Sequence, residues 1–385
     1  MRKRKICVVI TARPSYSRIK STLTALKGDP RVELQIVLAA SSLLDLYGKV
    51  SEHVYADGFE VQATVYNVID GQSRLTSAKT TGLGMIELAT VFDNLQPDLV
   101  VSIADRFETM ATAIAAAYMH IPLAHIQGGE VTGSIDEKVR HSITKLADTH
   151  YVSTELARER VIKMGEDPNT VHVTGCPSID IAASAAKRPN LDFDIYDRYR
   201  GVGKRLSLDH GYLVVLQHPV TNESEDARKQ MQATLEAVEQ VDLPVLCFWP
   251  NLDAGSDSIS RTIRIFRERG RGEKFHYFKN MEGYDFLRLL LQSKMIVGNS
   301  SVAIRECSFL GVPAVDIGTR QAGRERGPNV SQANYQTDDI IKCIRKQLDH
   351  GHYPANTLYG DGKAGERIGA LLSKVKLKTD KKLHY

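Results

Sequence analysis

Short apolar runs rich in β-branched residues alternate with amphipathic stretches along the whole chain, and this alternation most constrains its fold. In the first half the apolar runs are KICVVI, LQIVLAA, DLVVSIA, IPLAHI, THYVS and VHVTG, and in the second half they are YLVVLQ, LPVLCFW, KFHYF, KMIVGN and VPAVDIG. Helical patterns lie between them at residues 107–119, 136–146, 225–241 and 284–292. Such alternation predicts parallel sheets with helices on both faces, and continuous apolar strands indicate burial on both sides. We therefore expect an α/β fold built from doubly wound parallel sheets.

The length of the chain predicts two domains. Its 385 residues exceed one ordinary core, and domains of roughly 150 to 200 residues are expected. Between residues 182 and 211 the periodic pattern stops, so we place the interdomain connection there. The predicted domains are residues 1–185 and 206–360. Residues 361–385 would add a helix that packs back on the first domain and a charged tail that frays.

Charge and cysteine content exclude several classes of protein. The net charge of +4 is spread over the chain rather than clustered, which argues against a nucleic-acid partner. The five cysteines are far apart and form no CxxC pair, as expected for free thiols in a reducing cytosol. The basic, apolar start is too short for a signal peptide, and no apolar segment approaches the roughly 20 residues of a membrane helix. We expect a soluble, cytoplasmic protein with no membrane partner.

Polar residues that directly follow the predicted strands are the candidate site residues, because open α/β sheets bind ligands beyond the carboxyl ends of their strands. In the first half these segments are TARPSYSR, ADRFE and HIQGGEVTGSIDEKVRH, and in the second half they are QHPVTN, WPNLDAGS, GNSSVAIRE and GTRQAGRERG.

The segment GNSSVAIRE favours phosphate binding. Its strand is expected to end at Val297, and a helix is expected to begin at its two serines. Main-chain N–H groups, two hydroxyls and the positive end of the helix dipole would then lie together at the helix N-terminus. The alternative is plain N-capping by Asn299 or Ser300. Glu306 would lie about one and a half turns along that helix, where a carboxylate can accept from a ribose diol. Its alternative role is that of a solvated surface residue.

Three other segments each offer one or two candidate residues. His218 could donate a proton to a leaving oxygen, or merely satisfy a strand end. Arg13 and Arg18 could bind phosphate or form surface salt bridges, although the segment matches neither GxGxxG nor a Walker loop. Asp105 could act as a general base at the sheet edge, or cap the following helix.

The stretch HIQGGEVTGSIDEKVRH is rich in titratable groups. Its two glycines let the backbone approach a ligand closely. A helix that begins within SIDEKVRH would pair Asp136 with Arg140 and Glu137 with His141 at i,i+4 spacing. The alternative is that both carboxylates are ordinary first-turn residues favoured by the helix dipole.

Two other kinds of site fit this stretch poorly. A metal could be imagined among His125, Glu130, Asp136 and His141, but no HxxxH or HExxH spacing occurs, and we predict no metal site. A Ser/His/Asp hydrolase is disfavoured because no GxSxG elbow is present.

Taken together and in this order, GGEVTGSIDEKVRHSITKLA, QHPVT, PNLDAGS, GNSSVAIRE and GTRQAGRERG resemble the UDP-N-acetylglucosamine 2-epimerase family, specifically its hydrolysing branch used in sialic acid precursor synthesis. The resemblance covers nearly the whole chain. It implies a GT-B fold, in which two Rossmann-like domains hold a nucleotide sugar in a cleft. It also implies a homo-oligomer, a dimer or tetramer, and no metal or redox cofactor.

The resemblance also implies a reaction. A base removes the C2 proton of the sugar, the nucleoside diphosphate leaves from C1 by anti elimination, and a 2-acetamidoglucal forms. Water then adds, which releases N-acetylmannosamine and UDP.

Residue roles follow from the same resemblance. UDP binding is assigned to Arg13, Ser17, His218, Asn251, Ser300, Ser301, Glu306 and Arg320. Acid and base positions match or neighbour Asp105, Glu130, Asp136, Glu137 and His218. Asp105 is the candidate for proton transfer at C2, and His218 for the leaving phosphate. Further substrate contacts are expected from Arg106, Gln127, Arg140 and His141.

Two departures leave the substrate open. Gln127 stands where several relatives have Glu, and a neutral amide cannot take the C2 proton. Ala104 stands where relatives often have Gly. The alternatives are the same chemistry on a UDP-linked 2,4-diacetamido-trideoxy sugar or a GDP-linked sugar, a GT-B glycosyltransferase, and a non-catalytic nucleotide-sugar binding module.

Overall fold

The computed structural model describes residues 2–44, 50–70, 73–132, 135–250 and 255–384. The chain forms two compact units. Unit 1 comprises Met1–Glu130, Ile135–Asp180 and Gly360–Tyr385, and unit 2 consists mainly of Ile181–Tyr359. No helix of the described residues is long and apolar enough to span a bilayer.

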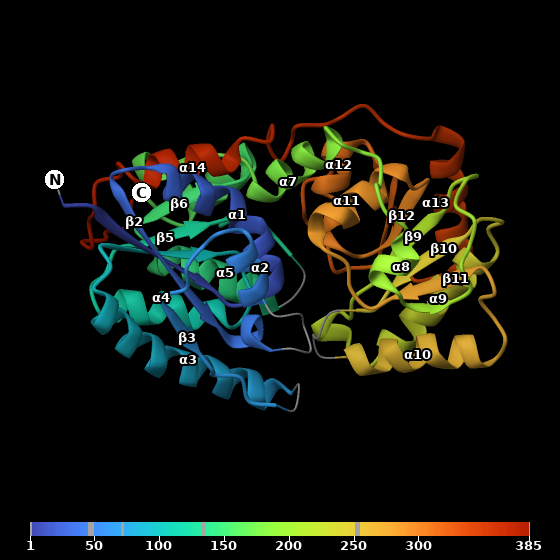
Figure 1. The fold of residues 1–385 in the computed structure, drawn as a ribbon, viewed down its shortest axis with the longest axis horizontal. Coiled ribbons are helices and arrows are strands. Elements are labelled where there is room, and N and C mark those ends of the chain that lie inside the picture. Colours follow the sequence, from blue (N-terminus) through green and yellow to red (C-terminus); the bar gives the residue numbers. More distant parts are fainter. Residues whose placement is uncertain (1, 45–49, 71–72, 133–134, 251–254, 385) are drawn as a thin grey trace. The chain divides into compact units, whose positions relative to one another are not determined.

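Unit 1 is built on a seven-stranded parallel sheet in the part of the chain that the structure describes (Figure 1). Its strands are β1 (Arg4–Ile10), β2 (Val32–Ala39), β3 (Ala63–Val65), β4 (Leu99–Ile103), β5 (Leu123–Ile126), β6 (Thr149–Val152) and β7 (Val171–Val173). They lie in the order β3-β2-β1-β4-β5-β6-β7, with Ile6 opposite both Leu34 and Leu99. All six runs predicted in the first half of the chain are confirmed as strands.

Helices cover both faces of this sheet. They are α1 (Arg13–Gly28), α2 (Val50–Ala56), α3 (Arg74–Leu95), α4 (Thr109–Tyr118), α5 (Ile135–Leu146), α6 (Glu155–Lys163) and α14 (Ala364–Leu372). Helix α7 (Pro177–Ala186) begins in unit 1, and its second half packs in the core of unit 2. Ile6 and Val8 of β1 pack with residues of α1 and α14. Cys7 and Val9, which point to the opposite face, pack with α3, α4 and α5. The alternation along β1 therefore shows burial on both sides, as the continuous apolar run predicts.

The C-terminal tail does not fray as expected but is bound to unit 1. Lys381 forms an ion pair of 2.7 Å with the buried carboxylate of Glu166, and it donates to the carbonyl of Thr144 at the end of α5. The His384 N–H donates to the carbonyl of Gly165. The prediction was wrong because it treated the tail charges as solvated, whereas one of them compensates a buried carboxylate.

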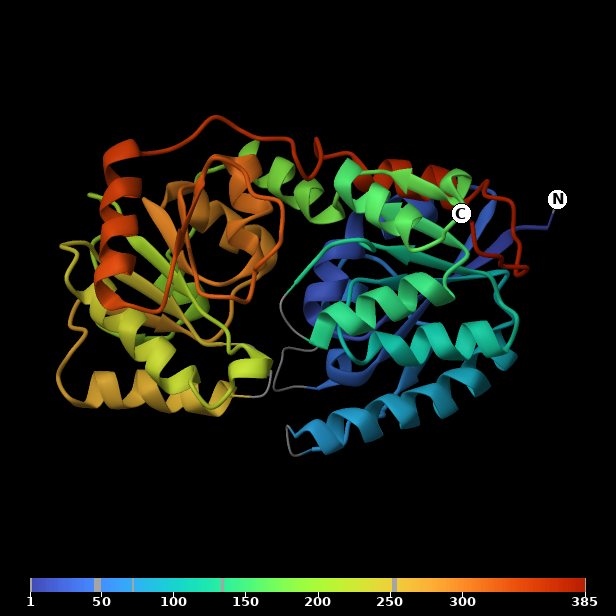
Figure 2. The same cartoon turned by 180° about the vertical axis from the view of Figure 1, so that it is seen from behind.

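Unit 2 contains a second seven-stranded sheet of described residues (Figure 2). Its strands are β8 (Val202–Gly203), β9 (Leu213–Leu216), β10 (Val245–Phe248), β11 (Phe275–Phe278), β12 (Met295–Gly298), β13 (Ala314–Ile317) and β14 (Val330–Ala333). The order is β14-β13-β12-β9-β10-β11-β8, and only the pairing of β8 with β11 is antiparallel. The five runs predicted in the second half are confirmed as strands.

The helices of unit 2 also enclose its sheet on both faces. They are α8 (Ile195–Tyr199), α9 (Ala227–Glu239), α10 (Ser256–Glu268), α11 (Gly283–Gln292), α12 (Glu306–Leu310) and α13 (Thr337–His350). Leu213 and Val215 pack with α9, α10 and α13, whereas Val214 packs with α11 and α12.

Each sheet has one point where the strand order reverses. In unit 1 the chain passes from β1 outward through β2 and β3, and then returns to β4 on the other side of β1. In unit 2 it passes from β9 through β10 and β11, and then returns to β12 beside β9. The loops that leave the carboxyl ends of neighbouring strands diverge at such a point, which makes it the usual ligand position of an open α/β sheet.

Candidate functional site

The reversal point of unit 1 is flanked by two predicted site segments. Arg13 begins α1 after β1, and Asp105 and Arg106 follow β4. Ala104, at the end of β4, has a φ of 64°, in the left-handed region that glycine adopts most readily. This conformation gives a physical reason for the glycine expected at this position in relatives.

Arg140 of α5 contacts several of the candidate site residues of unit 1. Its side chain is 1% exposed and forms an ion pair with Asp105. It also donates to the main-chain carbonyl of Glu130 at 2.9 Å and to the Glu137 carboxylate at 3.3 Å. Burial alone would lower the pKa of Arg140, but the charges of Asp105 and Glu130 raise it above its ordinary value. One buried guanidinium therefore contacts three acidic residues. The N-cap position of α4 is occupied by Glu108 rather than by Asp105.

The acidic first turn of α5 is paired along the helix. Glu137 accepts from His141 at 2.9 Å, which confirms the predicted i,i+4 contact. The charge of Asp136 acts on Arg140, and Arg140 also pairs with Glu137 at i,i+3 spacing. The other ring nitrogen of His141, Nδ1, is buried and has no hydrogen-bond partner among the described residues.

Gln127 and His125 lie at the end of β5. Gln127 has a φ of 68° and donates from Nε2 to the sulfur of Cys176 at 2.7 Å. Its Oε1 is buried without a hydrogen-bond partner in the described part of the chain. His125 is bound to the Ala104 carbonyl and to Thr144, and burial lowers its pKa to about 3. His125 is therefore a neutral structural residue, and no metal-binding group of three or more His, Cys, Asp or Glu occurs among the residues described.

Two further residues of unit 1 complete the network, and the sequence did not single them out. The buried Glu108 accepts from Arg106 through two hydrogen bonds of 3.2 Å. Ser153, directly after β6, donates to the buried carboxylate of Glu130 at 3.1 Å. Glu108 lies within the selected segment ADRFE, and Ser153 directly follows β6, so the same positional signal could have found Ser153 as well.

Unit 2 brings together residues from three strand ends. His218 follows β9, Asn299 follows β12, and Arg320 follows β13. Asn299 makes two hydrogen bonds to the main chain of His218, and its own carbonyl accepts from Arg320 at 3.2 Å. The structure thus places two predicted UDP-binding residues around one asparagine. Asn251 falls outside the described residues.

The serine loop after β12 differs from the continuous helix that the sequence predicts. Ser300 caps a short 3₁₀ turn at Ser301–Ala303, and α12 begins only at Glu306 after a turn at residues 304–305. A three-residue turn aligns few peptide dipoles, so the helix dipole contributes less to phosphate binding than the sequence predicts. The hydroxyls of Ser300 and Ser301 remain as candidate phosphate contacts.

Glu306 is buried rather than solvated, so its alternative surface role is excluded. Its Oε2 has no hydrogen-bond partner among the described residues. A buried carboxylate oxygen without a partner is uncommon and is consistent with a ligand donor at this position.

Arg305 is the main binding candidate that the sequence analysis missed. Its side chain is almost fully buried and donates from Nη2 to the Ser301 hydroxyl at 2.8 Å. It places a positive charge directly behind the serine loop. Its position beside Glu306 offered no periodic signal, because the helix expected there is interrupted.

The loop after β13 holds a buried ion pair. Asp316 of β13 accepts from Arg326 at 2.9 Å. Burial raises the pKa of Asp316 to about 6, against the opposing effect of Arg326 and the neighbouring Arg320 and Arg324. The pair fixes the loop that carries Arg320.

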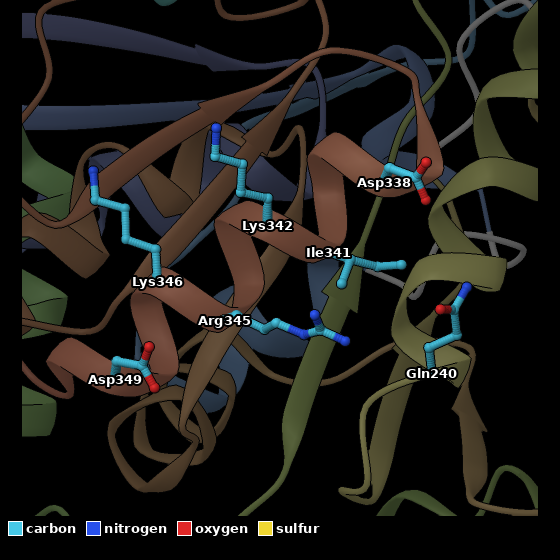
Figure 3. Close-up of a pocket in the computed structure, with 7 residues that line it drawn as sticks. All are labelled: Gln240, Asp338, Ile341, Lys342, Arg345, Lys346 and Asp349. Atoms are coloured by element: carbon cyan, nitrogen blue, oxygen red, sulfur yellow. The ribbon is translucent and has the colours of Figure 1, made fainter.

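A surface hollow of unit 2 lies elsewhere, at the end of α9 and along α13 (Figure 3). It is lined by Gln240, Asp338, Ile341, Lys342, Arg345, Lys346 and Asp349. None of these is a predicted site residue, and the charged ones are exposed. We assign this hollow no part in the site.

Solved structures confirm the fold. The Neisseria meningitidis UDP-GlcNAc 2-epimerase bound to UDP-GlcNAc matches with a TM-score of 0.79 and 17% identity, over 96% of this chain and 99% of that one. The Methanocaldococcus jannaschii UDP-GlcNAc 2-epimerase in complex with UDP-GlcNAc and UDP gives the same values. The chain therefore has the predicted GT-B type of fold, with two parallel-sheet α/β domains.

Comparison with sequences gives higher identities. The chain is 30% identical to the UDP-N,N'-diacetylbacillosamine 2-epimerase (hydrolyzing) of Legionella pneumophila, over 97% of both chains. It is 29% identical to the UDP-N-acetylglucosamine 2-epimerase of N. meningitidis, over 94% of this chain and 91% of the relative. It is also 30% identical to the polysialic acid biosynthesis protein P7 of Escherichia coli, over 90% and 86%. The family model for UDP-N-acetylglucosamine 2-epimerase matches residues 24–373, and the chain belongs to this family.

Proposed function

We propose that this chain is a hydrolysing UDP-N-acetylglucosamine 2-epimerase, which releases N-acetylmannosamine and UDP for the synthesis of sialic acid-type sugars. The observation that carries the proposal is the carboxylate cluster around Arg140, at the strand-order reversal of unit 1. Binding a diphosphate gains nothing from added negative charge, whereas proton transfer at a sugar carbon needs carboxylates. The cluster thus favours the epimerase over a non-catalytic binding module.

The unit 1 residues would carry out the proton transfer. Asp105, fixed by Arg140, takes the C2 proton of the sugar while the C1–O bond to the diphosphate breaks and a C1=C2 double bond forms. Water then adds across the double bond, its hydroxyl to C1 and a proton to C2 on the opposite face. Glu130, Asp136 and Glu137 are the candidates for returning that proton. Arg106 and His141 orient the sugar.

The unit 2 residues would bind UDP. His218 donates a proton to the leaving phosphate, and the hydroxyls of Ser300 and Ser301 bind the diphosphate in front of the buried charge of Arg305. Glu306 accepts from the ribose diol through its unpaired Oε2. The remaining proposed contacts to the substrate are Arg13, Ser17, Gln127, Asn251 and Arg320.

The names of two relatives support the hydrolysing outcome. The L. pneumophila and Campylobacter jejuni relatives are both named 2-epimerases (hydrolyzing), and both names specify diacetylbacillosamine. They also favour a second substrate, a UDP-linked or GDP-linked 2,4-diacetamido sugar. Gln127 supports this second candidate, because its neutral side chain replaces the Glu expected at a proton-transfer position and is held by Cys176.

Proton NMR in D₂O tests the proposal. The protein is incubated separately with UDP-N-acetylglucosamine and with UDP-N,N'-diacetylbacillosamine, and Asp105→Asn is the matched variant. We expect a free 2-epimerised sugar with deuterium at C2, release of UDP, and a loss of turnover by orders of magnitude in Asp105→Asn with UDP affinity kept. A deuterated sugar still linked to UDP would refute hydrolysis. UDP binding without any exchange at C2 would leave only the binding module, and sugar transfer to an acceptor without C2 exchange would indicate a glycosyltransferase.

We also expect a homo-oligomer, a dimer or tetramer. Helix α3 supports this expectation because it exposes large apolar side chains, including Leu75, Leu83 and Ile86. Light scattering of the wild-type protein and of Ile86→Glu tests the role of α3. An Ile86→Glu variant with an unchanged oligomeric state would refute it.

A further inference from the structure

Asn299 is the buried residue on which three strand ends of unit 2 converge. We infer that it is a positioning residue of the UDP-binding half of the site, acting through His218 and Arg320 without contacting the substrate. The inference rests on the proposed function, because the roles of His218 and Arg320 in UDP binding belong to that proposal.

The side chain of Asn299 is paired with the main chain of His218. Its Oδ1 accepts from the His218 N–H at 2.7 Å, and its Nδ2 donates to the His218 carbonyl at 2.8 Å. Both distances are short for hydrogen bonds between amides. Two bonds from one planar group fix the position and the orientation of the peptide at once. Asn299 is 0% exposed, so its side chain shields both bonds from water in the folded protein.

The backbone around Asn299 makes this pairing possible. Gly298 has a φ of 143°, and a Cβ at this position would lie 2.1 Å from the carbonyl oxygen of Leu216. The Asn299 N–H donates to that same carbonyl at 3.2 Å. A residue other than glycine would push β12 away from β9. The short side chain of Asn299 would then not reach His218.

The carbonyl of Asn299 links the third strand end. It accepts from Arg320 at 3.2 Å and from the buried side chain of Gln321 at 2.9 Å. Both donors belong to the loop after β13. One residue therefore fixes the loop of His218, the loop of Arg320 and the start of the serine turn at Ser300.

Only a carboxamide satisfies these contacts. The main chain of His218 presents one donor and one acceptor, and asparagine matches both. Aspartate would turn an acceptor toward the His218 carbonyl, and alanine would leave both groups unpaired in a buried place. Loss of such a partner is expected to weaken an interaction that depends on it by roughly ten- to a hundredfold.

The chain offers a matched control in Gln347. It is also a fully buried carboxamide of unit 2, and it donates to the carbonyls of Ala314 and Asn329 at 3.1 and 2.9 Å. Ala314 begins β13, so these bonds lie at the amino edge of the sheet, opposite the candidate site. Gln347→Glu makes the same chemical change as Asn299→Asp without touching His218 or Arg320.

The first measurement needs no nucleotide. Hydrogen exchange of the His218 amide is followed by NMR or mass spectrometry in the wild type, Asn299→Ala and Gln347→Glu. We expect exchange to accelerate at least about tenfold in Asn299→Ala and to stay near the wild-type rate in Gln347→Glu. Equal rates in all three would overturn the inference. Because this result does not depend on substrate, it separates a failure of the inference from a failure of the proposed function.

The second measurement tests whether Asn299 acts through His218. UDP affinity is measured by calorimetry for Asn299→Asp, His218→Ala and the double variant, at a temperature where all are folded. We expect Asn299→Asp to weaken UDP binding by roughly ten- to a hundredfold in the wild-type background and by clearly less in His218→Ala, because interacting residues are non-additive. Gln347→Glu should lower the Tm while keeping UDP affinity within about twofold of wild type. Additive effects, or an unchanged affinity in Asn299→Asp, would overturn the inference.

Discussion

Replacement of Arg140 by methionine is the sharpest test of the unit 1 site. Methionine keeps much of the side-chain volume but removes the positive charge that pairs with Asp105 and Glu137 and donates to the Glu130 carbonyl. Removing one partner of a buried ion pair costs about 3 to 5 kcal/mol. The side chains of Asp105 and Glu137 are 15% and 30% exposed, so water can solvate part of the released charge. We therefore expect the lower end of that range, about 3 kcal/mol.

This loss can be measured by scanning calorimetry. For a unit of this size, each kcal/mol shifts the Tm by about 2 to 4 °C, so Arg140→Met should lower the Tm by about 6 to 12 °C. At temperatures below the unfolding transition, the rate of C2 proton exchange in the sugar substrate should fall at least about a hundredfold, because Asp105 loses the group that positions it. UDP affinity should stay within about threefold of wild type, since the proposed UDP contacts lie mainly in unit 2.

Arg288 provides the control. It is a buried arginine of unit 2 that pairs with Asp285 at 3.4 Å and with Asp192 at 2.9 Å. Neither of these partners is a candidate site residue. Arg288→Met should lower the Tm similarly and leave C2 exchange near the wild-type rate. A Tm of Arg140→Met within about 1 °C of wild type would refute the buried ion pair. Unchanged exchange would refute the positioning of Asp105.

Three further predictions concern stability. Burial raises the pKa of Asp316 from 3.8 to about 6, so the folded protein holds this proton more tightly than the unfolded chain. Its stabilising contribution is complete below about pH 4 and falls by about 3 kcal/mol as the pH rises through 6. Asp316→Asn should flatten the dependence of the Tm on pH in this range; an unchanged slope would contradict the raised pKa. Ala104→Gly should raise the Tm by about 2 to 4 °C because it relieves roughly 1 kcal/mol of left-handed strain, and a lower Tm would contradict this. Lys381→Met should lower the Tm by at least about 2 °C because the buried Glu166 loses a cation, and an unchanged Tm would show that the tail contact is dispensable.

The fold was largely predictable because its strands are buried on both faces. All eleven apolar runs quoted from the sequence form strands, because short runs rich in β-branched residues favour strands that are buried on both faces. The structure adds β3, β8 and β14, which lie at the edges of their sheets. Edge strands pack against fewer neighbours, so their sequences, such as VSQA in β14, need no continuous apolar run.

The position of the site along the chain was predictable, but the burial of its side chains was not. Residues directly after strands were found because parallel strands carry their carboxyl ends to one edge. Whether a side chain reaches a ligand or supports another side chain depends on burial. Arg140 could have been recognised as buried, because it follows Val139 and precedes Ile143 by three positions in the apolar stripe of α5. The burial of Arg305 could not have been recognised, because the continuous helix expected at this position is replaced by a short 3₁₀ turn and a separate helix that begins at Glu306.

The two units support their proposed site residues by different physical means, and the charge of the ligand explains the difference. Under the proposed function, unit 1 gathers carboxylates for proton transfer. These carboxylates repel one another, and the buried cation Arg140 pairs with them. Under the same proposal unit 2 binds an anion, and an aspartate in place of Asn299 would oppose the field of Arg305 and Arg320. The neutral carboxamide of Asn299 satisfies the same need for buried hydrogen bonds without adding charge. The choice of arginine in one unit and asparagine in the other therefore follows from what each half of the proposed site must bind.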